Sequence, residues 1–242
     1  MLTTRVVRAG LVAPAVAHLQ LAKPAGFSYR TGEFARLGLR VRGEEVCRAY
    51  SIASLPSEDT VDFFIANVKG GQLSPRMNAL KAGDEVLIDP EAGGMLLADR
   101  LAPGGKHLWL FASGTGIAPF MGIIRDEAIT RAYERIILVH GVRTWDETEY
   151  ASRMITPQDK LIKLCSVTRV KDAAVTERIP SALASGKLEE LAGVKISKAD
   201  SRVMLCGNPA LVKAVREHMK GLGIASPRGG QPGELLAENF WL

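Results

Sequence analysis

Residues 48–51 read Arg48-Ala49-Tyr50-Ser51, and they lie in an apolar, strand-like run over residues 46–53. Alternation along a strand puts the arginine and the tyrosine on one face and the alanine and the serine on the other. A guanidinium can pair with a phosphate, an aromatic ring can stack on a planar ligand, and a hydroxyl can hydrogen-bond a ring nitrogen. The stretch suits a planar, charged ligand, although an ordinary edge strand would show the same pattern.

Short apolar runs separated by turn residues surround this stretch. The expected strands cover residues 6–7, 15–21, 34–41, 48–53, 61–68 and 85–89. This spacing predicts that residues 1–100 form an antiparallel β-barrel of the Greek-key type. In residues 37–42 apolar side chains alternate with Arg40 and Arg42, so both arginines are expected on the outer face of a strand.

The pattern changes near residue 101, where we place a domain boundary. Strands are then expected over residues 107–112, 135–140, 161–168 and 202–206, with helices over 117–130, 147–156, 179–185 and 209–220. Apolar strands joined by helices form a doubly wound parallel sheet, which binds ligands beyond the carboxyl ends of its strands. Residues 101–242 are therefore predicted to be an α/β domain.

The turn Gly114-Thr115-Gly116-Ile117-Ala118-Pro119 follows the first strand of this domain and precedes a helix. That is the context of a dinucleotide-binding loop, with Pro119 at the position of the third glycine. The alternative is a tight turn in which the glycines only supply positive φ.

Cations, and no acidic residue, follow the next two strands. The usual NAD site offers a carboxylate to the ribose at the end of the second strand, whereas this chain has Arg143 there. Thr168 and Arg169 end the third strand, and Arg178 follows nine residues later. Guanidinium groups suit the 2′-phosphate of NADPH, so a preference for NADPH over NADH is expected.

A second glycine turn, Gly71-Gln72-Leu73-Ser74, lies between two barrel strands. Ser74 is a good N-cap and Pro75 a good first helical residue, so free backbone N–H groups there could bind an anion. Capped helices that bind nothing show the same pattern.

Composition excludes several classes of protein. The 242 residues are 47% hydrophobic and 24% charged, which is typical of a soluble globular chain with two modest cores. No run approaches a membrane span of about 18 apolar residues, and no signal-peptide pattern is visible, so a cytoplasmic monomer is expected. Three scattered cysteines, Cys47, Cys165 and Cys206, support neither a disulfide framework nor a metal or iron–sulfur site.

The net charge of +5 is spread thinly along the chain. Residues 1–100 hold 12 basic and 11 acidic side chains, and the rest hold 19 and 15. This balance excludes a typical nucleic-acid binder, but it suits anionic small molecules and an acidic protein partner. Arg40 and Arg42 would belong to a docking surface for that partner, or to an ordinary solvated barrel face.

In this order and spacing, the motifs resemble the ferredoxin–NADP reductase family, and more narrowly its bacterial ferredoxin or flavodoxin reductases. The resemblance also rests on Val167-Thr168-Arg169, Cys206-Gly207-Asn208-Pro209 and the aromatic pair Phe240-Trp241. It implies FAD on the barrel, NADP(H) on the sheet, and hydride transfer between nicotinamide C4 and flavin N5. Single electrons would then pass to ferredoxin or flavodoxin.

The resemblance also implies roles for single residues. Ser51, Cys206 and Glu238 would be catalytic: Ser51 near N5, Cys206 beside nicotinamide C4 and not a nucleophile, and Glu238 exchanging protons. The implied FAD contacts are Arg48, Ala49, Tyr50, Ser51, Ile65, Gly71, Gln72, Leu73, Ser74, Thr115, Phe240 and Trp241. The implied NADP contacts are Gly114, Thr115, Gly116, Arg143, Thr168, Arg169, Arg178, Cys206 and Gly207.

The C-terminal tail is too apolar to remain in water, since exposed apolar surface costs about 25 cal/mol per Å². Leu235-Leu236 and Phe240-Trp241-Leu242 must therefore pack. The resemblance favours a lid, with Phe240 on the isoalloxazine and Trp241 beside the adenine. Docking of the tail on the protein's own surface is the alternative.

Two other functions are compatible with these motifs. One is a flavin-dependent reductase of another acceptor, such as an oxygenase component, free flavin or ferric iron. The other is a non-catalytic NADP-binding or electron-relay subunit, although Tyr50 and Ser51 are both retained.

Overall fold

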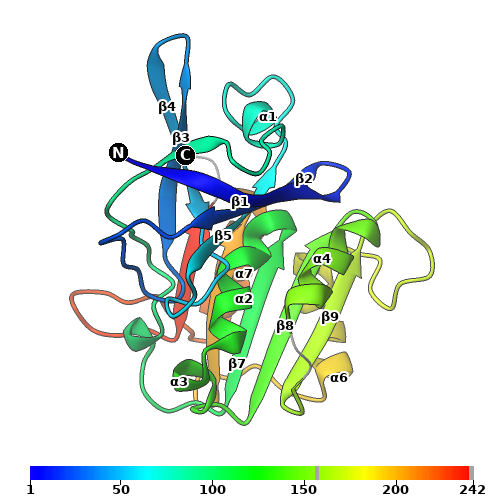
Figure 1. The fold of residues 1–242 in the computed structure, drawn as a ribbon. Helices are drawn as coiled ribbons and strands as arrows, with labels where there is room; N and C mark the ends of the chain where they lie inside the picture. Colours follow the sequence, from blue (N-terminus) through cyan, green and yellow to red (C-terminus); the bar gives the residue numbers. More distant parts are fainter. Residues whose placement is uncertain (156–157, 240–242) are drawn as a thin grey trace.

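A computed structural model describes residues 1–155 and 158–239, which form two sheets with helices around the second (Figure 1). The first sheet is antiparallel, in the order β4-β3-β6-β1-β2-β5. Its strands are β1 (Leu2–Ala13), β2 (Val16–Ala22), β3 (Phe34–Val41), β4 (Glu44–Ser51), β5 (Thr60–Ala66) and β6 (Glu85–Ile88). A bridge between Ile52 and Phe63 joins the two edges. The predicted antiparallel barrel is confirmed.

The barrel core forms because alternate strand residues are apolar. Leu19, Leu37 and Ile88, with the rest of the barrel core cluster, are almost fully buried. The turn between β3 and β4 differs from the prediction. Arg42 and Gly43 both have positive φ, 54° and 87°, as a two-residue hairpin turn requires. Arg42 therefore lies at the tip of a projecting hairpin (Figure 1) and not on the outer face of a strand.

The second sheet is parallel, in the order β11-β10-β7-β8-β9. Its strands are β7 (His107–Ser113), β8 (Arg135–Val142), β9 (Leu161–Val167), β10 (Ser201–Gly207) and β11 (Leu235–Asn239). The surrounding elements are η2 (Gly114–Ile117), α2 (Ala118–Arg125), α3 (Glu127–Thr130), α4 (Asp146–Met154), α5 (Ile179–Ala184), α6 (Lys187–Ala192) and α7 (Pro209–Gly221). The predicted doubly wound α/β domain is confirmed.

Alternation along β7 explains why both faces of this sheet are covered. Leu108 and Leu110 pack with α2 and α4, whereas Trp109 and Phe111 pack with α5, α6 and α7 on the other face. The expected helix over residues 117–130 is divided, because Asp126 leaves helical geometry and its carboxylate accepts the Ala128 N–H to begin α3. No helix in the described ranges is long and apolar enough to cross a bilayer.

The tail was predicted to be a lid, but residues 235–239 form strand β11 beside β10. Leu235 and Leu236 are buried, one in each layer of the sheet core. This part of the tail docks on the protein's own sheet, as the alternative expects, and the lid remains a prediction for Phe240 and Trp241. Phe240, Trp241 and Leu242 lie outside the described residues.

The barrel and the parallel sheet share one core cluster. Ala13, Val16 and Phe64 of the barrel pack in the same cluster as the side chains of α2 and α4. Arg125 is the last residue of α2, and its guanidinium donates to Glu58 Oε1 at 2.7 Å and to the Ala53 carbonyl at 2.9 Å. These contacts place the end of β4 against α2, which begins at the glycine turn of the parallel sheet.

Candidate functional site

The first motif lies at the end of edge strand β4. Tyr50 pairs in register with buried Ala35 and packs against the barrel core, whereas Arg48 is exposed. Burial raises the pKa of Tyr50 to about 12, so its hydroxyl remains neutral. The exposed guanidinium and the half-buried ring therefore sit on one strand edge, as alternation predicts.

The second motif is a turn stabilised by Ser74. The Ser74 hydroxyl accepts the Val68 N–H at 3.0 Å, and the Gly71 N–H donates to the Val68 carbonyl at 2.9 Å. The prediction that Ser74 caps a helix is wrong. Ser74 is the first residue of α1 (Ser74–Met77), and its side chain makes no capping bond to that helix. Within the described residues, the N–H groups of Gln72, Leu73 and Ser74 have no acceptor. With the Arg48 guanidinium and the Tyr50 ring, they form a donor set that fits a flavin nucleotide.

The glycines of the Gly114 turn are required by geometry. Gly114 has φ +53°, and a Cβ on Gly116 would collide with the carbonyl oxygen of Cys206. On the facing strand end, a Cβ on Gly207 would collide with the Ser113 hydroxyl. The turn and the end of β10 therefore approach more closely than any residue other than glycine would permit, at the carboxyl edge of the sheet.

The arginines gather at the same edge. The Arg169 N–H donates to the Arg143 carbonyl at 2.8 Å, so the ends of β8 and β9 lie side by side. Arg178 precedes α5 on a loop tied to β9 by the Ser166 hydroxyl, which donates to the Glu177 carbonyl at 2.7 Å. All three arginine side chains are exposed, and none forms an ion pair with a described residue. Thr168 is exposed between them.

The three residues expected to be catalytic converge from distant parts of the chain. Cys206 and Glu238 are register partners on β10 and β11, and the Ser51 side chain lies close enough to the Cys206 thiol to lower its pKa. Burial raises the pKa of Cys206 well above its usual value, as does the Glu238 charge, while Ser51 opposes the shift. The thiol is therefore protonated at neutral pH.

Glu238 is held by the loop after β6. Its carboxylate accepts the Met95 N–H, and a Cβ on Gly94 would lie 2.9 Å from Glu238 Oε1. Burial raises the pKa of Glu238, the Met95 and Leu96 amides lower it, and nearby Glu33 raises it. Glu33 and the 94–96 segment were not predicted. In the sequence, the glycine pair Gly93-Gly94 indicates a turn at this segment but nothing about Glu33.

Not every expected contact faces this site. The side chain of Ile65 packs in the barrel core cluster and does not face the motif edges. Ala49 is exposed on β4, on the face opposite Arg48 and Tyr50. Phe240 and Trp241 lie outside the described part of the chain.

Comparisons with known proteins agree with this geometry. The family model for an oxidoreductase FAD-binding domain matches residues 6–95, and that for an oxidoreductase NAD-binding domain matches residues 110–217. Ferredoxin–NADP reductase of Azotobacter vinelandii is 38% identical over 228 residues, which cover 88% of this chain and 87% of the relative. Flavodoxin/ferredoxin–NADP reductase of Escherichia coli (strain K12) is 34% identical over 219 residues, 88% of each chain. The crystal structure of a ferredoxin NADP+ reductase from Neisseria gonorrhoeae, with bound FAD and NADP, superposes with a TM-score of 0.92 at 27% identity over 98% of both chains.

Proposed function

Because this chain belongs to the ferredoxin–NADP reductase family, we propose that it exchanges a hydride with NADP(H) through FAD and single electrons with ferredoxin or flavodoxin. FAD, when bound, supplies the change from two-electron to one-electron chemistry. The protein supplies the binding, the orientation and the electrostatics. One arrangement carries this proposal. Ser51 of the barrel lowers the pKa of Cys206 in the parallel sheet, and Glu238 beside Cys206 accepts the Met95 N–H from the segment after β6, so the two motifs lie close together.

On the barrel side, Arg48 pairs with the cofactor phosphates and Tyr50 stacks on the ring system. The unpartnered N–H groups of residues 72–74 bind the pyrophosphate. Ser51, which lies near Cys206, would hydrogen-bond the flavin and orient it. The proposal assigns residues 1–100 to the FAD-binding domain and residues 101–242 to the NADP-binding domain.

On the sheet side, the turn of Gly114, Thr115 and Gly116 seats the nicotinamide half of NADP(H), and Gly207 admits it by close approach. Arg143, Arg169 and Arg178 bind the 2′-phosphate, with Thr168 between them. Cys206 stays a neutral thiol and packs beside the nicotinamide. Glu238, whose pKa is raised by burial, lies beside Cys206 and would exchange protons there. Holding two reactants in a fixed geometry accounts for about 7–11 kcal/mol of a reaction barrier.

Acceptor assays test the function. The purified protein, loaded with FAD, is mixed with NADPH and either ferredoxin, flavodoxin, free FMN or ferric citrate, and NADPH oxidation is followed at each acceptor concentration. We expect the protein carriers to be reduced with the highest kcat/KM. Faster reduction of free flavin or ferric iron would contradict the carrier assignment. A cytoplasmic location and a monomeric state complete the proposal.

A further inference from the structure

The carbonyl of Gly114, at the start of the dinucleotide turn, accepts two side-chain hydrogen bonds. His140 Nε2 lies 2.9 Å from this oxygen and Tyr150 Oη lies 3.3 Å from it. A carbonyl oxygen only accepts, so both groups donate, and the histidine carries its proton on Nε2. The two rings meet edge to face with centroids 6.4 Å apart.

The two donors orient the next peptide N–H. The described chain has no cis peptide bond, and in a trans peptide the N–H of Thr115 points opposite to the carbonyl of Gly114. Holding the carbonyl toward β8 and α4 therefore aims the Thr115 N–H away from them. That N–H has no acceptor among the described residues, so it is free to meet a ligand.

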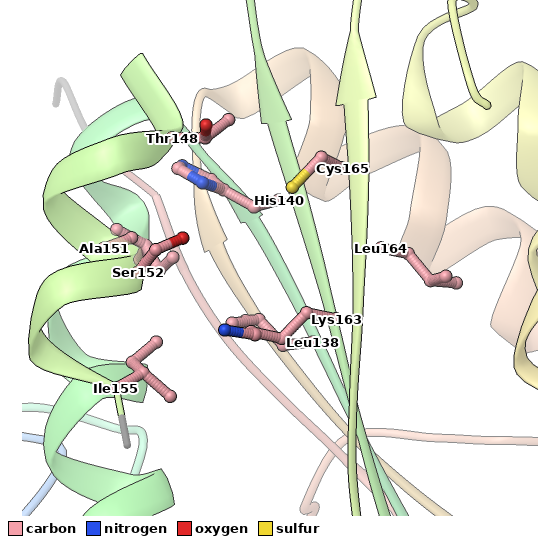
Figure 2. A pocket seen from close by; sticks show the side chains of 10 residues that line it. Leu138, His140, Thr148, Ala151, Ser152, Ile155, Lys163, Leu164 and Cys165 are labelled. Carbon is pink, nitrogen blue, oxygen red and sulfur yellow. The ribbon is translucent and has the colours of Figure 1, made fainter. Parts of the chain in front are cut away.

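The small space around His140 indicates that its ring holds the Gly114 carbonyl and does not bind a ligand of its own. His140 extends from β8 toward α4, at the level of Thr148, beside a cavity of about 20 Å³ (Figure 2). A cavity of this volume holds one water molecule and nothing larger. His140 is also 2% exposed, so no larger ligand reaches it from solvent.

Tyr150 is itself held by the barrel. Its ring lies against Phe64 of β5, with centroids 4.8 Å apart. Phe64 in turn stacks on His18 at 4.9 Å, and His18 Nε2 lies 2.9 Å from Asp62 Oδ1. An unbroken series of contacts therefore runs from barrel strands β2 and β5 to the carbonyl of Gly114.

We propose that Phe64, Tyr150 and His140 form a brace that sets the geometry of the Gly114 turn, so that the barrel helps to determine affinity for the nicotinamide half of NADP(H). This inference rests on the proposed function, since it needs the turn to receive the dinucleotide. Tyr150 and Phe64 are positioning residues in it, because neither is placed against a cofactor. The barrel would in this way influence nucleotide binding at a site formed by the other sheet.

The first test is Tyr150→Phe, which removes one donor and keeps the ring. Isothermal titration calorimetry of the FAD-loaded protein gives Kd for NADP+ and for adenosine 2′,5′-bisphosphate, which lacks the nicotinamide half. Loss of one hydrogen bond should weaken NADP+ about 10-fold and leave the bisphosphate within about twofold. Tyr133→Phe is the matched control, because Tyr133 packs against the same core cluster, whereas the bond to the Gly114 carbonyl comes from Tyr150. It should change neither Kd.

The second test is a double-mutant cycle with Phe64→Leu, which keeps an apolar side chain but removes the aromatic contact. Alone it should weaken NADP+ about threefold, with FAD content unchanged. Combined with Tyr150→Phe it should add nothing, because without the hydroxyl the position of the ring no longer affects the carbonyl.

Three results would overturn the brace: an unchanged NADP+ affinity in Tyr150→Phe, equal weakening of NADP+ and the bisphosphate, or additive effects in the cycle. The proposed function fails separately. A wild-type protein that binds neither FAD nor NADP+ would refute it, whereas a wild type that binds both beside a silent Tyr150→Phe would refute only the brace.

Discussion

The Ser51 side chain, at the end of barrel strand β4, lies close to the thiol of Cys206, at the end of β10 in the parallel sheet, and lowers its pKa. The two residues are 155 positions apart in the sequence. Ser51 ends a motif expected to bind FAD, and Cys206 begins one expected to bind NADP(H). In the proposed function, the two bound nucleotides meet at this point. Because Glu238 is the register partner of Cys206, the same point also holds a carboxyl group with a raised pKa.

Replacing Ser51 tests this meeting point. Ser51→Ala should slow reduction of bound FAD by NADPH about tenfold, because one oriented hydrogen bond is lost at the reacting edge. Anaerobic stopped-flow absorbance measures the rate, and Ser57→Ala, an exposed serine of the barrel, is the control. A Ser51→Ala rate equal to that of the control would remove Ser51 from the site.

Replacing Arg169 tests cofactor choice. Arg169→Ala should weaken NADPH binding about 10- to 100-fold and leave NADH within about twofold, since only NADPH carries the 2′-phosphate. Arg135→Ala is the matched control, because Arg135 is an exposed arginine at the opposite end of β8. Equal weakening of the two nucleotides by Arg169→Ala would mean that the arginine supports structure only.

The buried His140 side chain should make the protein less stable at acidic pH. Burial lowers its pKa to about 4, whereas in the unfolded chain the pKa is near the ordinary histidine value of about 6.5. Between these values the unfolded state binds more protons, so the free energy of unfolding falls as the pH falls, by about 2 kcal/mol between pH 7 and pH 5. Urea unfolding of wild type and His140→Gln at both pH values measures the difference. A variant with the same loss as wild type would show that other groups cause it.

Replacing Arg125 tests how much its contacts between α2 and the barrel contribute to the free energy of unfolding. Arg125→Ala removes the bonds to Glu58 and to the Ala53 carbonyl and should lower the free energy of unfolding by about 2–3 kcal/mol. Arg131→Ala, on an exposed side chain after α3, should change it by less than about 0.5 kcal/mol. Urea titration measures both. Similar midpoints for the two variants would count against the Arg125 contacts.

Much of the fold could be predicted because its signals are local. The alternation in β3 and the apolar runs of the parallel strands mark elements that bury one or both faces. The hairpin at Arg42 was missed because non-glycine residues seldom adopt positive φ, so Arg42 was read as part of the strand. Strand β11 was missed because a short apolar run shows only that it packs, and not on what.

In the site, too, residues with a local sequence signal could be predicted, and residues placed only by tertiary contacts could not. Motif residues such as Tyr50 and Gly116 were predictable because the ligand chemistry or the turn requires that residue type. Met95 holds Glu238 through its backbone N–H, which any residue could supply, and His140 and Tyr150 meet Gly114 only through tertiary contacts. Such contacts leave no periodicity or spacing in the sequence.

The visible absorption spectrum of the purified protein, recorded before and after anaerobic addition of NADPH, tests the central claim most directly. The account predicts a flavin spectrum from tightly bound FAD, which NADPH bleaches and which added oxidised ferredoxin or flavodoxin restores. A colourless protein that cannot be reconstituted with FAD, or bound FAD that NADPH leaves oxidised, would contradict it.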